Sequence, residues 1–221
     1  KKFESHPDSG FIFSNSRLIS EDGKDMQLNL WTATSNDLED WEIMTEIEQL
    51  LILIRQNVVY GHTLSIRSCY KNLLFPFSCN TFTHDIWISI FLTALGHNGL
   101  IEKTSLVDYR QHHNQVAGAT VRGKQKNVNE TNQYSAMHRR RLSFDYHAIA
   151  RQVEDLGATD SNVQLLYDAA NYNAERSKLY ECGLLAGFQI IFILTFNGKY
   201  RLFGNSYLSA LKDMTMLIFT K

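Results

Sequence analysis

The sequence lacks the features that mark several specialised classes of protein. Its 221 residues include three cysteines, Cys69, Cys79 and Cys182, an odd number without Cys-x-x-Cys spacing. This usage excludes a disulfide framework and favours a reduced, cytosolic chain. The formal net charge is −1, so the composition predicts no basic face, and we expect no nucleic-acid partner.

Long apolar runs are also missing. The most apolar stretch, residues 184–196, has 13 residues, whereas a helix needs about 20 to cross a bilayer. The chain is 44% hydrophobic and 20% charged, an ordinary balance for a globular protein. Its length suits one domain, or one domain plus a helical appendage, and is ample for a sizeable core.

What is present begins with clear hydrophobic periodicity in the first half of the chain. Residues 11–19 read as a short strand and its exit, and residues 44–59 repeat apolar side chains at helical spacing. Residues 85–96 are apolar on nearly every face, which predicts a buried helix. Residues 100–107 then read as a strand that leads to polar residues at its carboxyl end. We expect Trp31 and Trp41 to be packing anchors.

The second half has a different character. Residues 120–135 are polar and predict a flexible connection, while residues 136–193 predict at least two helices, the later one capped by Asp160 or Ser161. The tail, residues 198–221, sets four cations against one acid among apolar side chains. We interpret it as a final helix covering the core, or as a segment that lies on a membrane surface.

Five stretches stand in an order and spacing that resemble a known family. They are Gly10–Asn15, Gly61–Arg67, Leu74–Pro76, His84–Trp87 and Tyr109–Ala119, with an acidic glycine turn after the first. Together they resemble a family 2 glycosyltransferase with the GT-A fold, closest to the rhamnosyltransferase-like branch that builds bacterial surface polysaccharides. The resemblance covers residues 1–120 well and the remainder only loosely.

The resemblance implies a fold class and a division of the chain. We expect an α/β protein with a partial, Rossmann-like mixed sheet, flanking helices and a C-terminal helical extension. Residues 1–119 would be the acceptor-side part of the transferase domain, 120–135 a linker, and 136–221 a helical extension that contacts the membrane. The implied location is the cytoplasm, at the cytoplasmic face of the inner membrane.

The resemblance also implies site residues and partners. Inverting transfer from a nucleotide-sugar donor to a glycan or lipid-linked acceptor needs a base, and Asp85 matches the family's base position. Mg²⁺ or Mn²⁺ serves the intact enzyme, with His112 as a metal ligand and Arg110 on the donor diphosphate. Gly118 and Ala119 would let the next loop close over the donor. The expected acceptor contacts are Gly61, His62, Thr63, His84 and Trp87.

Each of these assignments has a plainer structural alternative. Asp85 could simply cap its helix, Gly61 could serve a plain turn, and Trp87 could belong to the core. His112 could hydrogen-bond the diphosphate or fix its loop. The basic run 138–141 reads as a solvated helix face, with anionic lipid or a lipid-linked acceptor as the second interpretation.

The sequence departs from the family in one large respect. The Asp-x-Asp motif that holds the metal on the donor diphosphate is absent, and so is the strand–helix unit that would bind the nucleotide base. We therefore expect a fragment that is inactive alone and that self-associates through an exposed sheet edge. Two alternatives remain: a non-catalytic glycan-binding or interaction domain, and a metallohydrolase using His62, His84, Asp85 and His112.

Overall fold

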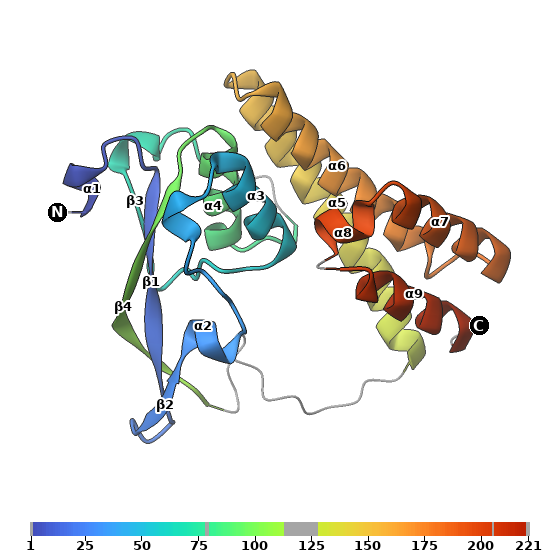
Figure 1. Cartoon of the computed structure of the whole chain (residues 1–221), viewed down its shortest axis with the longest axis horizontal. Coiled ribbons are helices and arrows are strands. Elements are labelled where there is room, and N and C mark those ends of the chain that lie inside the picture. The colour runs from blue at the N-terminus through green and yellow to red at the C-terminus, as the bar shows by residue number, and fades with distance from the viewer. Residues whose placement is uncertain (1, 78–79, 113–127, 205, 220–221) are drawn as a thin grey trace. The chain divides into compact units, whose positions relative to one another are not determined.

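The structure, a computed structural model, describes residues 2–77, 80–112, 128–204 and 206–219. It contains a mixed sheet with flanking helices followed by C-terminal helices, which confirms the predicted fold class (Figure 1). The elements in chain order are α1 (Lys2–Ser5), β1 (Phe11–Ile19), β2 (Asp25–Asn29), α2 (Leu30–Ala33), η1 (Trp41–Ile43), α3 (Glu46–Arg55), β3 (Leu64–Ile66), η2 (Ser68–Tyr70), α4 (His84–Ala94), β4 (Gly99–Arg110), α5 (Val128–Asp155), α6 (Asp160–Lys178), α7 (Leu184–Phe196), α8 (Lys199–Phe203) and α9 (Leu208–Phe219).

The chain folds into two compact units that interleave along the sequence. The first comprises Lys1–Phe75 and His84–Lys124, and the second comprises Pro76–Thr83 and Gln125–Lys221. The short segment Pro76–Thr83 therefore belongs with the C-terminal helices, although first-unit residues stand on both sides of it in the sequence.

Strand β1 is the centre of the sheet in the first unit. It pairs in parallel with β4 along its whole length, antiparallel with β3 near its start, and antiparallel with β2 near its end. Figure 1 shows α2, α3 and α4 on the same side of this sheet. Almost every side chain of β1 is buried, so the strand predicted over residues 11–19 is confirmed.

Aromatic side chains fill the core beside β1. The ring of Phe13 meets Trp31 and Trp41 edge-on, with ring centroids 5.9 and 5.2 Å apart. The indole Nε1 of Trp41 donates to the carbonyl oxygen of Gly99 at 2.8 Å, which fixes the start of β4 against η1. Edge-to-face pairs of this kind stabilise a core beyond the area they bury. Both tryptophans are packing anchors, as expected.

Helix α4 is buried as the sequence predicted. Nine of its side chains are buried, because it carries apolar residues on nearly every face. It ends at Ala94, and Gly96 follows with a φ of +87°, the left-handed conformation that a glycine C-cap adopts. The predicted helix over 44–59 is also present as the shorter α3.

Two predicted boundaries differ from the structure. The ladder between β1 and β4 continues to Ile19, the last residue of β1, so β4 extends to Arg110. Tyr109 and Arg110 therefore lie inside a strand. Helix α5 begins at Val128, so residues 128–135 of the expected linker are helical; the earlier part, 120–127, lies outside the described residues. Polar sequence alone did not distinguish a solvated helix from a loop.

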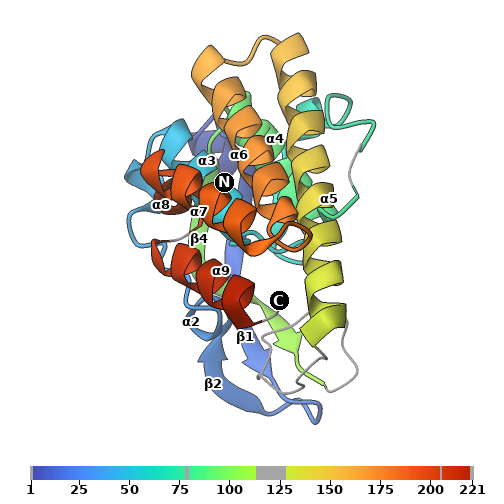
Figure 2. The same ribbon diagram turned by 90° about the vertical axis from the view of Figure 1, so that its right-hand side faces the viewer.

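In the second unit, α5 and α6 lie side by side in both ribbon views (Figures 1 and 2). The turn between them contains Gly157, whose φ is +84°, and Thr159 occupies the N-cap position of α6, one residue before the predicted cap, without a side-chain capping hydrogen bond. Buried alanines allow the two helices to approach closely. The fully buried contacts are Ile149, Ala150, Val153, Leu166, Ala169 and Ala170.

An ion pair joins α6 to α9 inside this unit. The guanidinium of Arg176 donates two hydrogen bonds to the carboxylate of Asp213, at 2.8 and 2.7 Å, and both side chains are buried. The hydroxyl of Tyr200 donates to the same carboxylate at 2.6 Å, and Tyr172 accepts from Arg176 at 3.1 Å. Burial lowers the pKa of Arg176, but the bonds and charge of Asp213 outweigh it, so the guanidinium stays charged.

A second buried carboxylate fixes the segment 76–83 to α5. Asp145, which has no exposed surface, accepts hydrogen bonds from the backbone N–H groups of Asn80, Thr81 and Phe82, at 2.6, 2.7 and 3.0 Å. Next to it, the rings of Phe82 and Tyr146 pack edge to face, with centroids 5.0 Å apart. This contact explains why the segment belongs to the second unit.

We predict that Asp213→Ala lowers the free energy of unfolding by about 3–5 kcal/mol, because it leaves the Arg176 charge buried without its carboxylate. Urea denaturation followed by circular dichroism measures the change. Asp155→Ala, at an exposed position at the end of α5, is the matched control and should change stability by less than about 0.5 kcal/mol. An equal effect of both substitutions would contradict the prediction.

Candidate functional site

The residues matched to the transferase family meet around the start of α4. Asp85 lies in the first turn of α4 and is 7% exposed. Its Oδ2 accepts a hydrogen bond from the backbone N–H of Gly61 at 2.9 Å, and its Oδ1 accepts one from the backbone N–H of Ile86 at 3.0 Å. Each oxygen of the carboxylate thus accepts one backbone hydrogen bond. The bond from Gly61 joins the 60–63 turn to the helix.

Gly61 lies close to the imidazole ring of His84. A Cβ atom at this position would lie 2.5 Å from Nε2 and 2.9 Å from Cε1 of the His84 imidazole. The φ of Gly61 is not in the left-handed region, so close approach of the ring is the reason for glycine. Three of the predicted site residues, Gly61, His84 and Asp85, are thus in direct contact.

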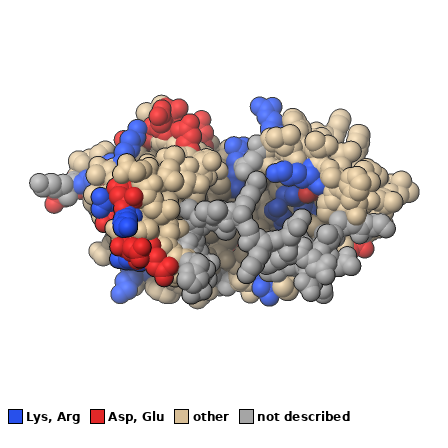
Figure 3. Space-filling model, turned by 90° about the horizontal axis from the view of Figure 1, so that it is seen from below, with Lys and Arg blue, Asp and Glu red and all other residues tan. Residues whose placement is uncertain are grey.

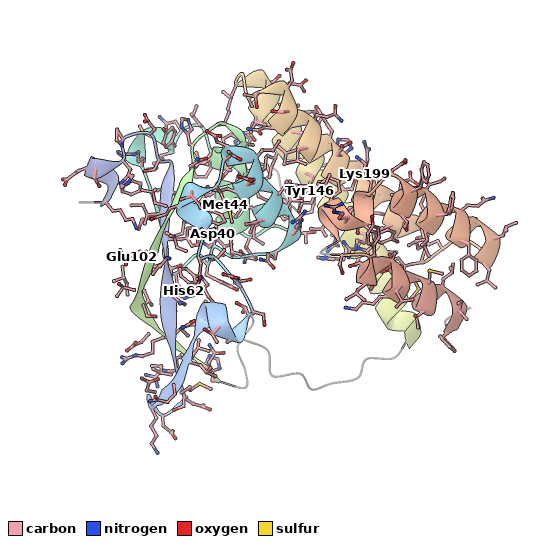
Figure 4. The ribbon with its side chains drawn as sticks, viewed as in Figure 1. Asp40, Met44, His62, Glu102, Tyr146 and Lys199 are labelled. Atoms are coloured by element: carbon pink, nitrogen blue, oxygen red, sulfur yellow. The ribbon has the colours of Figure 1, made fainter. Side chains whose placement is uncertain are left out.

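His62 faces the sheet (Figure 4). Its Nε2 lies 2.8 Å from Oγ of Ser16, a fully buried residue of β1. On its face, the imidazole stacks on the ring of Tyr109 from β4, with centroids 4.4 Å apart and planes 18° apart. Burial lowers the pKa of His62, and the charge of Asp85 only partly opposes this, so the imidazole is neutral at pH 7.

Two of the expected acceptor contacts are structural instead. The hydroxyl of Thr63 donates to the carbonyl oxygen of Tyr60 at 2.9 Å, and its backbone N–H donates to the same oxygen at 2.8 Å. These bonds close the 60–63 turn. Trp87 has no exposed surface and stacks on Phe91, with centroids 6.3 Å apart. A sugar cannot stack on a ring that is enclosed in the core, so Trp87 is a packing residue.

The residues expected on the donor side lie around the end of β4. Successive strand residues point to opposite faces, so Tyr109 faces His62 while Arg110 points away from it. Nη1 of Arg110 donates to the carbonyl oxygen of Glu21 in the turn after β1. His112 follows the strand and is exposed, and the expected lid residues Gly118 and Ala119 lie outside the described residues.

Asp108, two residues before Arg110 in the sequence, pairs with a different arginine. Asp108 accepts two hydrogen bonds from Arg17 of β1, both at 2.8 Å. This bidentate pair spans the parallel strands β1 and β4 and lowers the pKa of Asp108, first through the hydrogen bond itself. Asp108 therefore fixes the register of the sheet rather than the orientation of Arg110.

The geometry identifies two site residues that sequence reasoning missed, Ser16 and the ring of Tyr109. Ser16 ends the buried polar run Ser14-Asn15-Ser16, in a strand whose other buried side chains are apolar. Buried polar side chains in a strand require partners, so this run was the available signal. Its neighbour Asn15 enters a different environment, a pocket of about 440 Å³ that also includes Trp31 and Lys103 in its lining.

The described residues contain no preformed site for the metal that the resemblance predicts. Within them, no three His, Cys, Asp or Glu side chains are grouped as ligands of one ion would be. His62, His84, Asp85 and His112 therefore do not form the centre that a metallohydrolase would need in the part of the chain that the structure describes.

Comparisons of the chain with protein-family models, with curated proteins and with solved structures gave no match.

We predict that the imidazole of His62 titrates below its ordinary pKa of about 6.5, because burial disfavours its charged form. NMR titration of the His62 ring measures the midpoint. Asp85→Asn removes the carboxylate that favours the imidazolium, so the midpoint should fall further. Asp37→Asn, a substitution of the same chemistry outside the cluster, should leave it unchanged.

The same shift predicts how stability depends on pH. The unfolded chain binds a proton at His62 more readily than the folded chain, so the free energy of unfolding should rise with pH until about pH 6.5 and then level off. Burial also lowers the pKa of His97, which contributes with the same sign. His62→Gln should therefore reduce the slope of the free energy of unfolding against pH. An unchanged slope would contradict the lowered pKa of His62.

Proposed function

We propose that the first unit is the acceptor-side part of an inverting glycosyltransferase. It would act on a glycan or lipid-linked acceptor and use a nucleotide sugar as donor. The observation that supports this most is the hydrogen bond from the Gly61 amide to the Asp85 carboxylate. It joins two separate stretches, 61–67 and 84–87, that carry the resemblance to the family and that would line one acceptor site.

Asp85 supplies the chemistry in this proposal. As the acceptor hydroxyl oxygen bonds to the anomeric carbon, the bond from that carbon to the diphosphate oxygen breaks, and the nucleoside diphosphate leaves with its electron pair. The hydroxyl proton passes to the Asp85 carboxylate. The backbone N–H groups of Gly61 and Ile86 each donate to one oxygen of this carboxylate, which fixes its orientation at the start of α4.

The neighbouring imidazoles would position the acceptor. His84 is exposed, lies against Gly61 and adjoins the base in sequence, so its ring can donate to or accept from a sugar hydroxyl. His62 is held by Ser16 and Tyr109, which fixes the turn that carries Gly61.

A non-catalytic glycan-binding domain is the second candidate. The observation in its favour is that both oxygens of Asp85 already accept backbone hydrogen bonds and that the residue is 7% exposed. Such a domain would bind the acceptor and never transfer a sugar. A transfer assay with labelled nucleotide sugars on a chain that also carries a donor-binding part separates the two, since transfer that is lost in Asp85→Asn requires the base.

We predict that Gly61→Ala weakens acceptor binding while the fold survives. The added Cβ would displace the exposed His84 ring rather than the backbone, so the stability loss should be about 1 kcal/mol or less. Saturation-transfer NMR with a panel of free oligosaccharides measures binding. Gly183→Ala, where a Cβ meets open space, is the matched control. Equal binding by wild type and Gly61→Ala would remove Gly61 and His84 from the acceptor site.

We also predict that UDP, dTDP and GDP, each with Mn²⁺, raise the melting temperature of this chain by less than about 1 °C. Ligands stabilise only a protein that holds a site for them, and the sequence lacks the Asp-x-Asp motif. A thermal-shift titration, repeated without the metal, measures this. A metal-dependent rise with one nucleotide would locate a donor site in this chain and contradict its assignment to the acceptor side.

A further inference from the structure

Helix α7 presents an apolar stripe to solvent. Leu185, Phe188, Phe192 and Phe196 follow one another at intervals of three and four residues, which places them on one side of the helix. They are 76%, 37%, 69% and 82% exposed, whereas the opposite side is buried through Gly187, Ile191 and Leu194. No described helix is long and apolar enough to cross a bilayer.

The exposed area is large for a protein surface. A phenylalanine side chain presents about 200 Å², so the three rings of the stripe expose on the order of 400 Å² together. Scattered exposed apolar residues are ordinary, but contiguous patches of this size mark an interaction surface. The rings of Phe192 and Phe196 are parallel to within 18°, with centroids 6.1 Å apart, so they already form one surface.

Helix α9 packs against α7 and adds apolar side chains of its own. Leu217 lies so close to Gly187 that a Cβ there would be 2.5 Å from the leucine Cδ2, so the glycine permits the contact. The exposed large apolar residues of α9 are Leu208, Leu211, Ile218 and Phe219. We call these four, together with the α7 stripe, the apolar face.

The exposed charged side chains within the stretch that forms α7, α8 and α9 are all cationic. Residues 182–219 contain a single acid, Asp213, and its carboxylate is buried against Arg176. Two cations of this stretch, Arg201 and Lys212, are exposed, and a third, Lys199, pairs with Asp168 at 2.7 Å. In Figure 3 the acidic side chains in view gather mainly over the first unit.

We propose that the apolar face of α7 and α9 lies in the interface of an anionic lipid bilayer. The phenylalanine and leucine side chains would enter the boundary between headgroups and acyl chains, and Arg201 and Lys212 would contact lipid phosphates. The 13 residues of α7 suit a helix that lies in the membrane plane. This inference depends only on the second unit and is independent of the proposed transferase activity.

Charge favours lipid over a second copy of this chain. Two copies meeting through the apolar face would bring the like charges of their Lys212 side chains close together, and residues 182–219 hold no exposed carboxylate to offset them. An anionic bilayer supplies the missing negative charge. The experiment must therefore also detect whether two copies of the chain associate through the apolar face.

Vesicle co-sedimentation of the full chain tests the proposal. The probes are phosphatidylcholine vesicles with and without about one third phosphatidylglycerol, at low and high salt. We expect stronger binding to the anionic vesicles, weakened by salt. Phe192→Asp combined with Phe196→Asp should lower the partition constant at least tenfold, since it places charge in the apolar boundary. Phe75→Asp, another exposed phenylalanine in the first unit, is the matched control and should bind as wild type.

A second variant separates charge from apolar contact. Arg201→Gln with Lys212→Gln should reduce binding to anionic vesicles several-fold and leave the weak binding to neutral vesicles unchanged. Light scattering of wild type and the double phenylalanine variant reports self-association. Failure of the wild type to sediment with vesicles, unchanged binding by the double phenylalanine variant, or a dimer that this variant dissociates would each overturn the proposal.

Discussion

The first unit depends on a single strand, β1. Each of the other three strands that the structure describes pairs with it: β4 on its full length, β3 near its start and β2 near its end. Because a strand has only two edges, β2 and β3 share one edge by dividing the length of β1 between them. Nine residues therefore determine the sheet, its aromatic core and the position of Ser16 at the candidate site.

Buried carboxylates fix segments of irregular backbone to helices in both units. Asp85 binds the 60–63 turn to α4, and Asp145 binds the segment 76–83 to α5. A carboxylate accepts several hydrogen bonds at once, so one side chain can satisfy backbone N–H groups that no strand or helix pairs. In the proposed transferase Asp85 would thus have two roles, since the carboxylate that joins the turn to α4 would also be the base.

The hydrophobic pattern of neighbouring residues predicted the main strands and helices. The contacts that it did not predict join residues far apart in the sequence. Strand β1 and helix α4 were predictable because their apolar periodicity is itself local. The contact of Ser16 with His62 joins residues 46 apart, and no local rule indicates it. The sequence did not predict the burial of Trp87 for another reason. A tryptophan near the start of a helix can either pack in the core or stack against a sugar.

The assignment of the segment 76–83 to the second unit limits where the polypeptide can be cut into separate units. Because this segment packs with the second unit, the polypeptide passes between the units three times, after Phe75, Thr83 and Lys124. Truncation before the helices of the second unit would separate α5 from the backbone that Asp145 binds. Neither unit is a contiguous gene segment, so recombination or cleavage at one point cannot release either of them whole.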